Sequence, residues 1–212
     1  EKESLARYFS NDIVEKILSE DFHQNMLGGN ENATILFLDI RGFTTISETL
    51  KPDKVADLLN RIYPDFMELI LGNGGSVNKL IGDALVATFG LPIGTASDTY
   101  NAVKTARELI KWTEMFSKVK PDYLGNYEIK IGIGITTGEV FAGNIGSFRR
   151  LEYTVIGDIV NTASRLQNLT KKVGVDILID GATKKQLGDL ATTRTVRVKS
   201  IRGKKERVDI YT

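Results

Sequence analysis

Apolar and polar positions along the chain form blocks whose spacing predicts helices and strands. Residues 34–40 (TILFLDI) are almost wholly apolar, which is typical of a strand buried on both faces. The spacing of apolar residues predicts an amphipathic helix over 52–71, which we expect Pro64 to kink or split. The same spacing predicts helices over 97–116 and 159–169.

The other apolar segments predict strands. Residues 76–79 and 84–89 form a predicted hairpin closed by a tight Gly82-Asp83 turn, and 127–135 (YEIKIGIGI) alternate as a half-buried strand does. Further strands are expected over 140–145, 153–156, 175–179 and 207–211. The order strand, helix, hairpin, helix, strand matches the ferredoxin-like βαββαβ plan. We therefore expect an α/β (α+β) fold with a C-terminal strand–helix extension.

A separate helical segment precedes this pattern. Its apolar residues are four apart, at Leu5, Phe9, Ile13 and Ile17, so we expect a helical linker over 1–30 and one domain over 31–212. The chain begins without Met and runs straight into a helical pattern, so we interpret it as a piece of a longer protein with a sensor domain upstream. No apolar run approaches the roughly 20 residues of a membrane span. We expect a cytoplasmic domain, within a full-length protein that could still be membrane-anchored.

Composition narrows the possible chemistry. Lys and Arg number 28 against 27 Asp and Glu, which gives no basic footprint for nucleic acid. The absence of cysteine excludes disulfides, thiolate zinc sites and cysteine nucleophiles. The single histidine, His23, cannot build a multi-histidine metal cluster, and we expect it to be a surface residue.

Two acids are the first candidates for chemistry. Asp39 closes the first strand and Asp83 lies at the hairpin tip, which the predicted topology places beside it. Carboxylates on adjacent strand ends can share hard cations such as Mg²⁺, and two such metals can clamp the oxygens of a phosphoryl displacement. An Asp in a Gly-Asp turn is often only a turn former. Asp39 is harder to dismiss, because an unpaired acid closing a buried strand is costly.

Two further segments could bind phosphate. Residues 41–45 (RGFTT) lead from the first strand toward a helix, where backbone amides can cradle a triphosphate. Asn161 and Arg165 are four apart and share a helix face that could hold a polyphosphate. An ordinary strand-to-helix connection and a solvated helix face remain the alternatives. The pattern GxxxxGK[ST] is absent, so this is not a P-loop enzyme.

Four ordered segments together resemble the catalytic domain of class III adenylate and guanylate cyclases. They are LFLDIRGFT (36–44), NKLIGDALVATFG (78–90), GITTGEVFAGNIGS (134–147) and YTVIGDIVNTASRLQ (153–167), and the resemblance covers roughly 33–212. LARYFSNDIVEKIL (5–18) also resembles the linker that precedes many bacterial cyclase domains. The resemblance implies a nucleotide cyclase domain that acts as a homodimer with shared active sites.

The resemblance also implies roles for individual residues. Asp39 and Asp83, with the carbonyl of Ile40, would bind two Mg²⁺ or Mn²⁺ ions. Asn161 and Arg165 would steady the ribose and the transition-state phosphate. The triphosphate would be held by the backbone of Phe43 and Thr44 and, in a looser match, by Lys204. Glu139 stands where some relatives carry a phosphate-binding arginine, so one phosphate contact stays unassigned.

The family reads the purine with two positions, which match Lys79 and Thr154 here. An ammonium only donates hydrogen bonds, so Lys79 suits the acceptor N1 of adenine and opposes the N1–H of guanine. Thr154 can accept from the exocyclic amine. Guanylate-forming members have Glu at the lysine position, so the resemblance implies that ATP is converted to cyclic AMP and pyrophosphate.

Three alternatives stay open. The chain could be a guanylate cyclase, which Lys79 argues against, or a catalytically silent nucleotide-binding dimerisation module. A diguanylate-forming enzyme could share the βαββαβ core, but its GGDEF-type hairpin is missing, because the turn here reads IGDA (81–84). Lysine paired with threonine resembles a bacterial subgroup that includes bicarbonate-responsive members.

Overall fold

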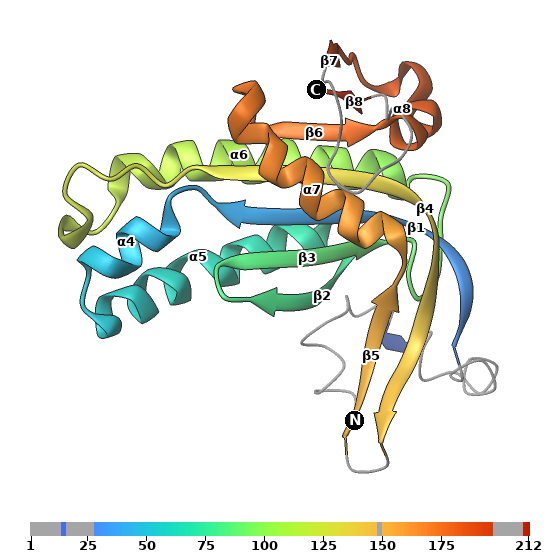
Figure 1. Ribbon diagram of the computed structural model, residues 1–212, viewed down its shortest axis with the longest axis horizontal. Helices are drawn as coiled ribbons and strands as arrows, with labels where there is room; N and C mark the ends of the chain where they lie inside the picture. The colour runs from blue at the N-terminus through green and yellow to red at the C-terminus, as the bar shows by residue number, and fades with distance from the viewer. Residues whose placement is uncertain (1–13, 16–27, 148–149, 197–209) are drawn as a thin grey trace.

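The computed structural model describes residues 14–15, 28–147, 150–196 and 210–212. Its centre is an antiparallel sheet with the strand order β2-β3-β1-β4, in which helices connect β1 to β2 and β3 to β4 and a turn connects β2 to β3 (Figure 1). This order and the sequence of elements confirm the predicted ferredoxin-like βαββαβ core. The core elements are β1 (Gly29–Ile40), α5 (Pro52–Gly72), β2 (Gly75–Ile81), β3 (Ala84–Phe89), α6 (Asp98–Val119) and β4 (Ile131–Ser147).

The C-terminal extension is also present. β5 pairs with β4 as a long hairpin, and β6 adds to the sheet parallel to β4 and is followed by β8 and β7. The helix α8 and the short strand β7 are not among the predicted elements. The extension consists of β5 (Arg150–Ile156), α7 (Asp158–Val173), β6 (Ile177–Asp180), α8 (Gly181–Leu187), β7 (Thr195–Val196) and β8 (Ile210–Tyr211); short helices lie at α4 (Phe43–Thr49), η1 (Asp122–Leu124) and η2 (Gly188–Leu190).

The sheet is covered on both faces. α5 and α6 pack on one face, and α7 crosses the other face over β1 and β4 (Figure 1). Along β1, Leu36 and Leu38 belong to the core beneath α5 and α6, while Ile35 and Phe37 belong to the core on the α7 side. The apolar run therefore forms a strand buried on both faces, as its composition predicts.

β4 differs from its prediction in extent and in burial. The two strands expected over 127–135 and 140–145 are one strand of 17 residues that begins at Ile131. It is not half-buried, because Gly132 and Gly134 face α7 with no room for a side chain. A Cβ on Gly132 would lie 2.5 Å from the Thr170 hydroxyl, and one on Gly134 would lie 2.1 Å from the Ala163 carbonyl oxygen. The alternating glycines let α7 rest directly on the strand.

The helix α5 also departs from its prediction. It continues through Pro64 without a break. Pro64 is exposed, whereas Ile62 and Phe66 on either side of it are fully buried. Proline removes one helix hydrogen bond, but packing of the neighbouring residues holds the helix together where propensity alone predicts a kink.

The predicted residues at the N-terminus lie mostly outside the described part of the chain. β1 begins at Gly29, while His23 and nearly all of the expected linker over 1–30 are not described. Lys204 lies in the undescribed segment 197–209. Among the described residues, no helix combines the length and apolar character that crossing a bilayer requires.

Candidate functional site

Asp39 and Asp83 meet where β1 and the β2–β3 hairpin end. β1 pairs with β3 so that Leu38 lies opposite Leu85, which brings the hairpin turn alongside Asp39. Burial is the main cause that raises the pKa of Asp39 to about 7, followed by side-chain hydrogen bonding with Asp83 and by the charge of that neighbour. The predicted proximity of the two acids is therefore correct.

The acid pair has the properties of an incomplete cation site. The Oδ1 atom of Asp39 is buried and has no hydrogen-bond partner among the described residues. A buried oxygen left in this way is costly, and a cation would satisfy it. No group of three or more His, Cys, Asp or Glu among the described residues could hold a metal. The donor set thus fits a hard cation that keeps water or phosphate oxygens as its other ligands.

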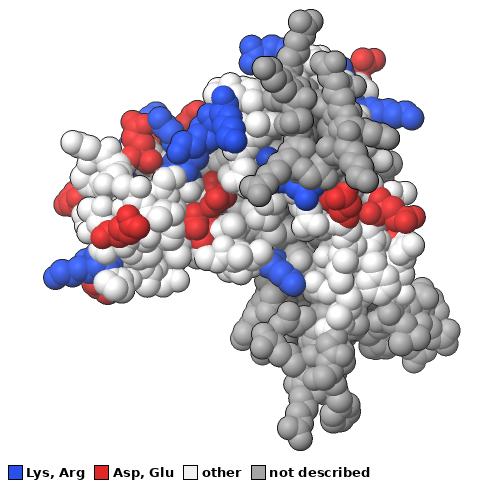
Figure 2. Space-filling model, in the orientation of Figure 1, with Lys and Arg blue, Asp and Glu red and all other residues white. Residues whose placement is uncertain are grey.

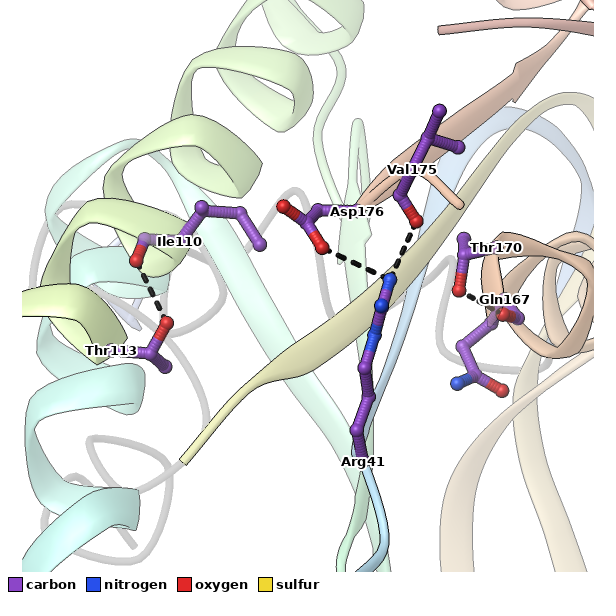
Figure 3. Close-up of polar contacts among 7 residues, drawn as sticks. All are labelled: Arg41, Ile110, Thr113, Gln167, Thr170, Val175 and Asp176. Atoms are coloured by element: carbon purple, nitrogen blue, oxygen red, sulfur yellow. Dashed lines mark hydrogen bonds and ion pairs between the residues drawn. The ribbon is translucent and has the colours of Figure 1, made fainter. Parts of the chain in front are cut away.

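Arg41, the residue after β1, is anchored to the segment that leads into β6. The guanidinium of Arg41 donates to the carbonyl oxygen of Val175 and lies 3.0 Å from a carboxylate oxygen of Asp176 (Figure 3). This clamp joins the end of β1 to the start of β6. The sequence analysis does not predict it, because a charge in a glycine loop carries no signal about a partner 134 positions later.

The loop between β1 and α4 presents backbone amides. Gly42 takes a left-handed conformation with φ 71° and precedes the first helical residue, Phe43. No side chain caps α4, so the first-turn amides have no side-chain partner there. Phe43 packs partly against the core, and Thr44 is exposed. This arrangement is compatible with the predicted role of the loop in holding phosphate.

Asn161 and Arg165 lie on α7, away from the residues that pack it on the sheet. Asn161 is exposed, and Arg165 is partly exposed and lies 4.0 Å from Asp158. One terminal nitrogen of Arg165 is buried without a hydrogen-bond partner among the described residues. Ala163 and Leu166, on the packed face, are fully buried. The predicted pair therefore shares an outward side of the helix.

The two predicted base-reading residues occupy different strands. Lys79 is exposed on β2, and Thr154 is buried on β5 with 8% of its surface exposed. Thr154 pairs with Gly143 of β4, whereas Asp39 pairs with Gly132 of the same strand. At about 3.3 Å per residue, these eleven positions amount to about 36 Å of strand. The structure does not bring Thr154 and Asp39 together within one chain.

Glu139, the position without an assigned phosphate contact, is exposed on β4. It pairs with Asn32 of β1 and accepts a 3.5 Å hydrogen bond from the side chain of Asn30. Neither contact reaches the acid pair.

Tyr63 is a residue of the site that the sequence analysis misses. Its hydroxyl donates a 2.6 Å hydrogen bond to the carbonyl oxygen of Gly82, next to Asp83. Burial, followed by the charges of Asp83 and Asp39, raises the pKa of Tyr63 to about 12. In the sequence Tyr63 is one apolar position of an amphipathic helix, so its hydroxyl gives no local signal.

The face of the molecule in Figure 2 carries acidic and basic side chains interspersed over the described elements. Neither sign of charge therefore dominates this face.

Comparisons with known proteins agree with this geometry. A family model described as "Adenylate and Guanylate cyclase catalytic domain" matches residues 27–212. The chain is 29% identical to adenylate cyclase 1 of Rhizobium meliloti over 98% of its own length, and 32% identical to adenylate cyclase of Anabaena cylindrica over 99%. It spans only 31% and 42% of those two proteins.

Solved structures show the same fold. The adenylyl cyclase CyaB from P. aeruginosa superposes with a TM-score of 0.79 at 30% identity, covering 87% of this chain and 94% of that one. The guanylyl cyclase Cya2 superposes with a TM-score of 0.77 at 34% identity, covering 88% of this chain and 93% of that one. Both kinds of enzyme are therefore similar to this chain to about the same degree. Overall likeness does not distinguish adenine from guanine as the base of the substrate.

Proposed function

The chain belongs to the family of adenylate and guanylate cyclase catalytic domains, and on this premise we propose that it converts ATP to 3′,5′-cyclic AMP and pyrophosphate. The observation that supports catalysis is the acid pair, in which a buried oxygen of Asp39, beside Asp83, has no hydrogen-bond partner within the described part of the chain. A catalytically silent module has no need to keep such a costly arrangement.

In the proposed reaction the ribose 3′-oxygen attacks the α-phosphorus. A bond forms between these atoms, the bond to the bridging oxygen of pyrophosphate breaks, and the 3′-hydroxyl proton passes to water or to a phosphate oxygen. Asp39, Asp83 and the carbonyl of Ile40 would hold two Mg²⁺ or Mn²⁺ ions. When bound, these ions supply a lower pKa for the 3′-hydroxyl and neutralise the polyphosphate.

The other residues would bind and orient the substrate. Arg165 would offset the charge that builds up on the transferring phosphoryl group, and Asn161 would hold the ribose. The amides of Phe43 and Thr44 would contact the triphosphate, because they open a helix that lacks a side-chain cap. Lys204 would add a cation to the same phosphates.

Adenine selection would rest on Lys79 and Thr154. The ammonium of Lys79 is exposed and can donate to N1 of adenine, and the Thr154 hydroxyl can accept from the exocyclic amine. Guanine would place its N1–H against a second donor, which leaves both unsatisfied.

We propose that each active site is shared by two copies of the chain. Asp39 and Thr154 are too far apart along β4 to contact one nucleotide, so the base-reading residue at each metal site would come from a partner. Exposed apolar side chains adjoin both sets: Leu80 and Ile81 near the acid pair and Ile156 near Thr154. A head-to-tail pairing of two such surfaces creates two equivalent sites.

A guanylate cyclase is the second candidate, because the guanylyl cyclase Cya2 is 34% identical to the chain. The purified domain should be supplied with ATP or GTP, each with Mg²⁺ or Mn²⁺, and the cyclic nucleotide identified. We expect cyclic AMP, and we expect Asp39→Ala to abolish it. Cyclic GMP as the main product would favour the second candidate. The absence of any product from either nucleotide, in a folded dimer, would favour the silent module.

Shared sites can be tested by mixing two inactive variants. Asp39→Ala and Arg165→Ala should each be inactive, but a random mixture should regain about a quarter of wild-type activity, because half of the dimers then contain one intact site of two. The control mixture is Asp39→Ala with Asp83→Ala. Both changes damage the same half of a site, so every site stays broken and no activity should return. Equal inactivity of the two mixtures would contradict shared sites.

A further inference from the structure

The turn that carries Asp83 is held from outside by a tyrosine. The hydroxyl of Tyr63, on α5, donates to the carbonyl oxygen of Gly82 at 2.6 Å. Gly82 is the first of the two turn residues and has φ 64°, whereas no residue other than glycine among those described has a positive φ. The signs of φ at its two central residues therefore match a type II′ turn, with Asp83 as the second of them.

The bonded carbonyl belongs to the central peptide of that turn, which links Gly82 to the backbone nitrogen of Asp83. Type I′ and type II′ turns join the same pair of strands but differ in the orientation of this peptide and in the sign of φ at the second residue. Rotation of the peptide would turn the carbonyl away from Tyr63 and change the backbone angle that sets where the Asp83 carboxyl points. The tyrosine bond selects one of the two orientations.

The residues that lead into the turn have little packing to make this selection, although β3, which follows it, is buried. Leu80 and Ile81, which precede the turn, are 45% and 56% exposed. Tyr63 is attached to the rigid part of the molecule, because its neighbour Ile62 and the nearby Phe66 on α5 are fully buried in the main core. The hydroxyl thus connects the turn to a helix that is packed in the main core.

From these contacts we infer that Tyr63 is a positioning residue for the metal site, acting through the Gly82–Asp83 peptide to hold the Asp83 carboxyl beside Asp39. The inference rests on the proposed function, since it presumes that the acid pair binds metal. Tyr63 touches neither substrate nor metal in this role. Its contribution is the orientation of one ligand.

The test compares Tyr63→Phe with Tyr123→Phe in the purified dimer. Tyr123 is a matched control, because its hydroxyl makes one 2.7 Å hydrogen bond to a carboxylate of Asp57 away from the site. Binding of Mn²⁺ is followed by the electron paramagnetic resonance signal of the free ion, in the presence of 3′-deoxy-ATP, which lacks the attacking hydroxyl. Unfolding temperatures and the Mn²⁺ dependence of turnover with ATP are measured in parallel.

We expect Tyr63→Phe to weaken Mn²⁺ binding by roughly threefold to tenfold, the effect of one lost hydrogen bond. Turnover at saturating Mn²⁺ should stay near the wild-type value, and Tyr123→Phe should bind Mn²⁺ normally. Equal Mn²⁺ affinity in both phenylalanine variants, with equal losses of stability, would overturn the positioning role while leaving the site intact. Wild-type Mn²⁺ binding that Asp39→Asn does not reduce would instead overturn the metal site, and the inference with it.

Discussion

Two partly buried carboxyl groups at strand ends make an instructive comparison. Asp39 near the end of β1 and Asp180 at the end of β6 both have a pKa raised chiefly by burial. Asp180 accepts hydrogen bonds from the backbone amide of Thr183 at 2.9 Å and from its hydroxyl at 2.6 Å. Asp39 keeps one buried oxygen that no described residue hydrogen-bonds, and it lies beside a second acid. Asp180 is satisfied by the protein, whereas Asp39, the proposed metal ligand, keeps an oxygen that a bound cation would satisfy.

The partners of Asp180 extend through the protein as a run of buried hydroxyls. Four threonines connect Asp180 to the side-chain oxygen of Gln186 through five hydrogen bonds, in the order Thr183, Thr137, Thr34 and Thr99. Each hydroxyl supplies a single proton, so one further proton is needed. Either Asp180 is protonated or the amide NH₂ of Gln186 faces Thr99. The run joins β1, α6, β4 and α8 and makes this region a closed polar network.

The largest effect expected from this comparison is on activity. Asp39→Asn removes a proposed metal ligand itself. It should therefore reduce cyclase activity by more than the roughly 10- to 100-fold loss that follows when a residue that only supports a metal ligand is removed. Asp180→Asn is the matched control, and it should keep near-normal activity. Similar losses in the two variants would mean that Asp39 has no special role.

Asp39→Asn should also stabilise the metal-free protein. The folded pKa of Asp39, about 7, lies above its ordinary value of 3.8. Protonated Asp39 therefore contributes to the free energy of unfolding. This contribution is fully present below pH 3.8 and is lost as the pH rises through about 7. Since asparagine stays neutral, Asp39→Asn should raise the unfolding temperature above that of the wild type at pH 8, with a smaller gain at pH 6. Thermal unfolding in chelator at both pH values measures this, and a gain that shrinks with rising pH would contradict it.

A smaller effect is expected from breaking the closed network. Thr183→Val keeps the shape of the side chain but removes the hydroxyl that bonds to Asp180 and Thr137. We expect a loss of about 1–3 kcal/mol in the free energy of unfolding, the cost of leaving buried polar groups unpaired. Thr105→Val is the control, because this buried hydroxyl bonds only to the carbonyl of Asn101 in its own helix. Denaturant unfolding should show the larger loss for Thr183→Val, and the reverse order would exclude the network as a stabilising unit.

The two acids also differ in how far the sequence predicts them. Asp39 closes an apolar strand and Asp83 lies in a two-residue turn, so the predicted hairpin and sheet order already place them together. Asp180 directly follows a segment predicted as a strand over 175–179, and its threonine partners come from elements far apart along the chain. No local sequence pattern predicts such a network, because threonine is common in exposed strands as well.

Some predictions failed because packing overrides local preference. The helix α5 passes through Pro64 unbroken, and β4 is one long strand instead of two. The alternation in β4 indicated a solvent-facing side, but the residues between the isoleucines are glycines that lie beneath α7. A glycine at an alternate position gives the same pattern whether water or a helix lies over it, so only the packing of α7 decides its burial.

The sequence by itself determined the βαββαβ order of the core and the meeting of Asp39 with Asp83. These features follow from hydrophobic period and turn residues, which act over a few neighbouring positions. Only the tertiary structure decided that Thr154 lies far from Asp39, that Arg41 clamps β6 and that Tyr63 bonds to Gly82. Those contacts depend on strand register and on the rotation of each helix against the sheet, which side chains distant in sequence settle together.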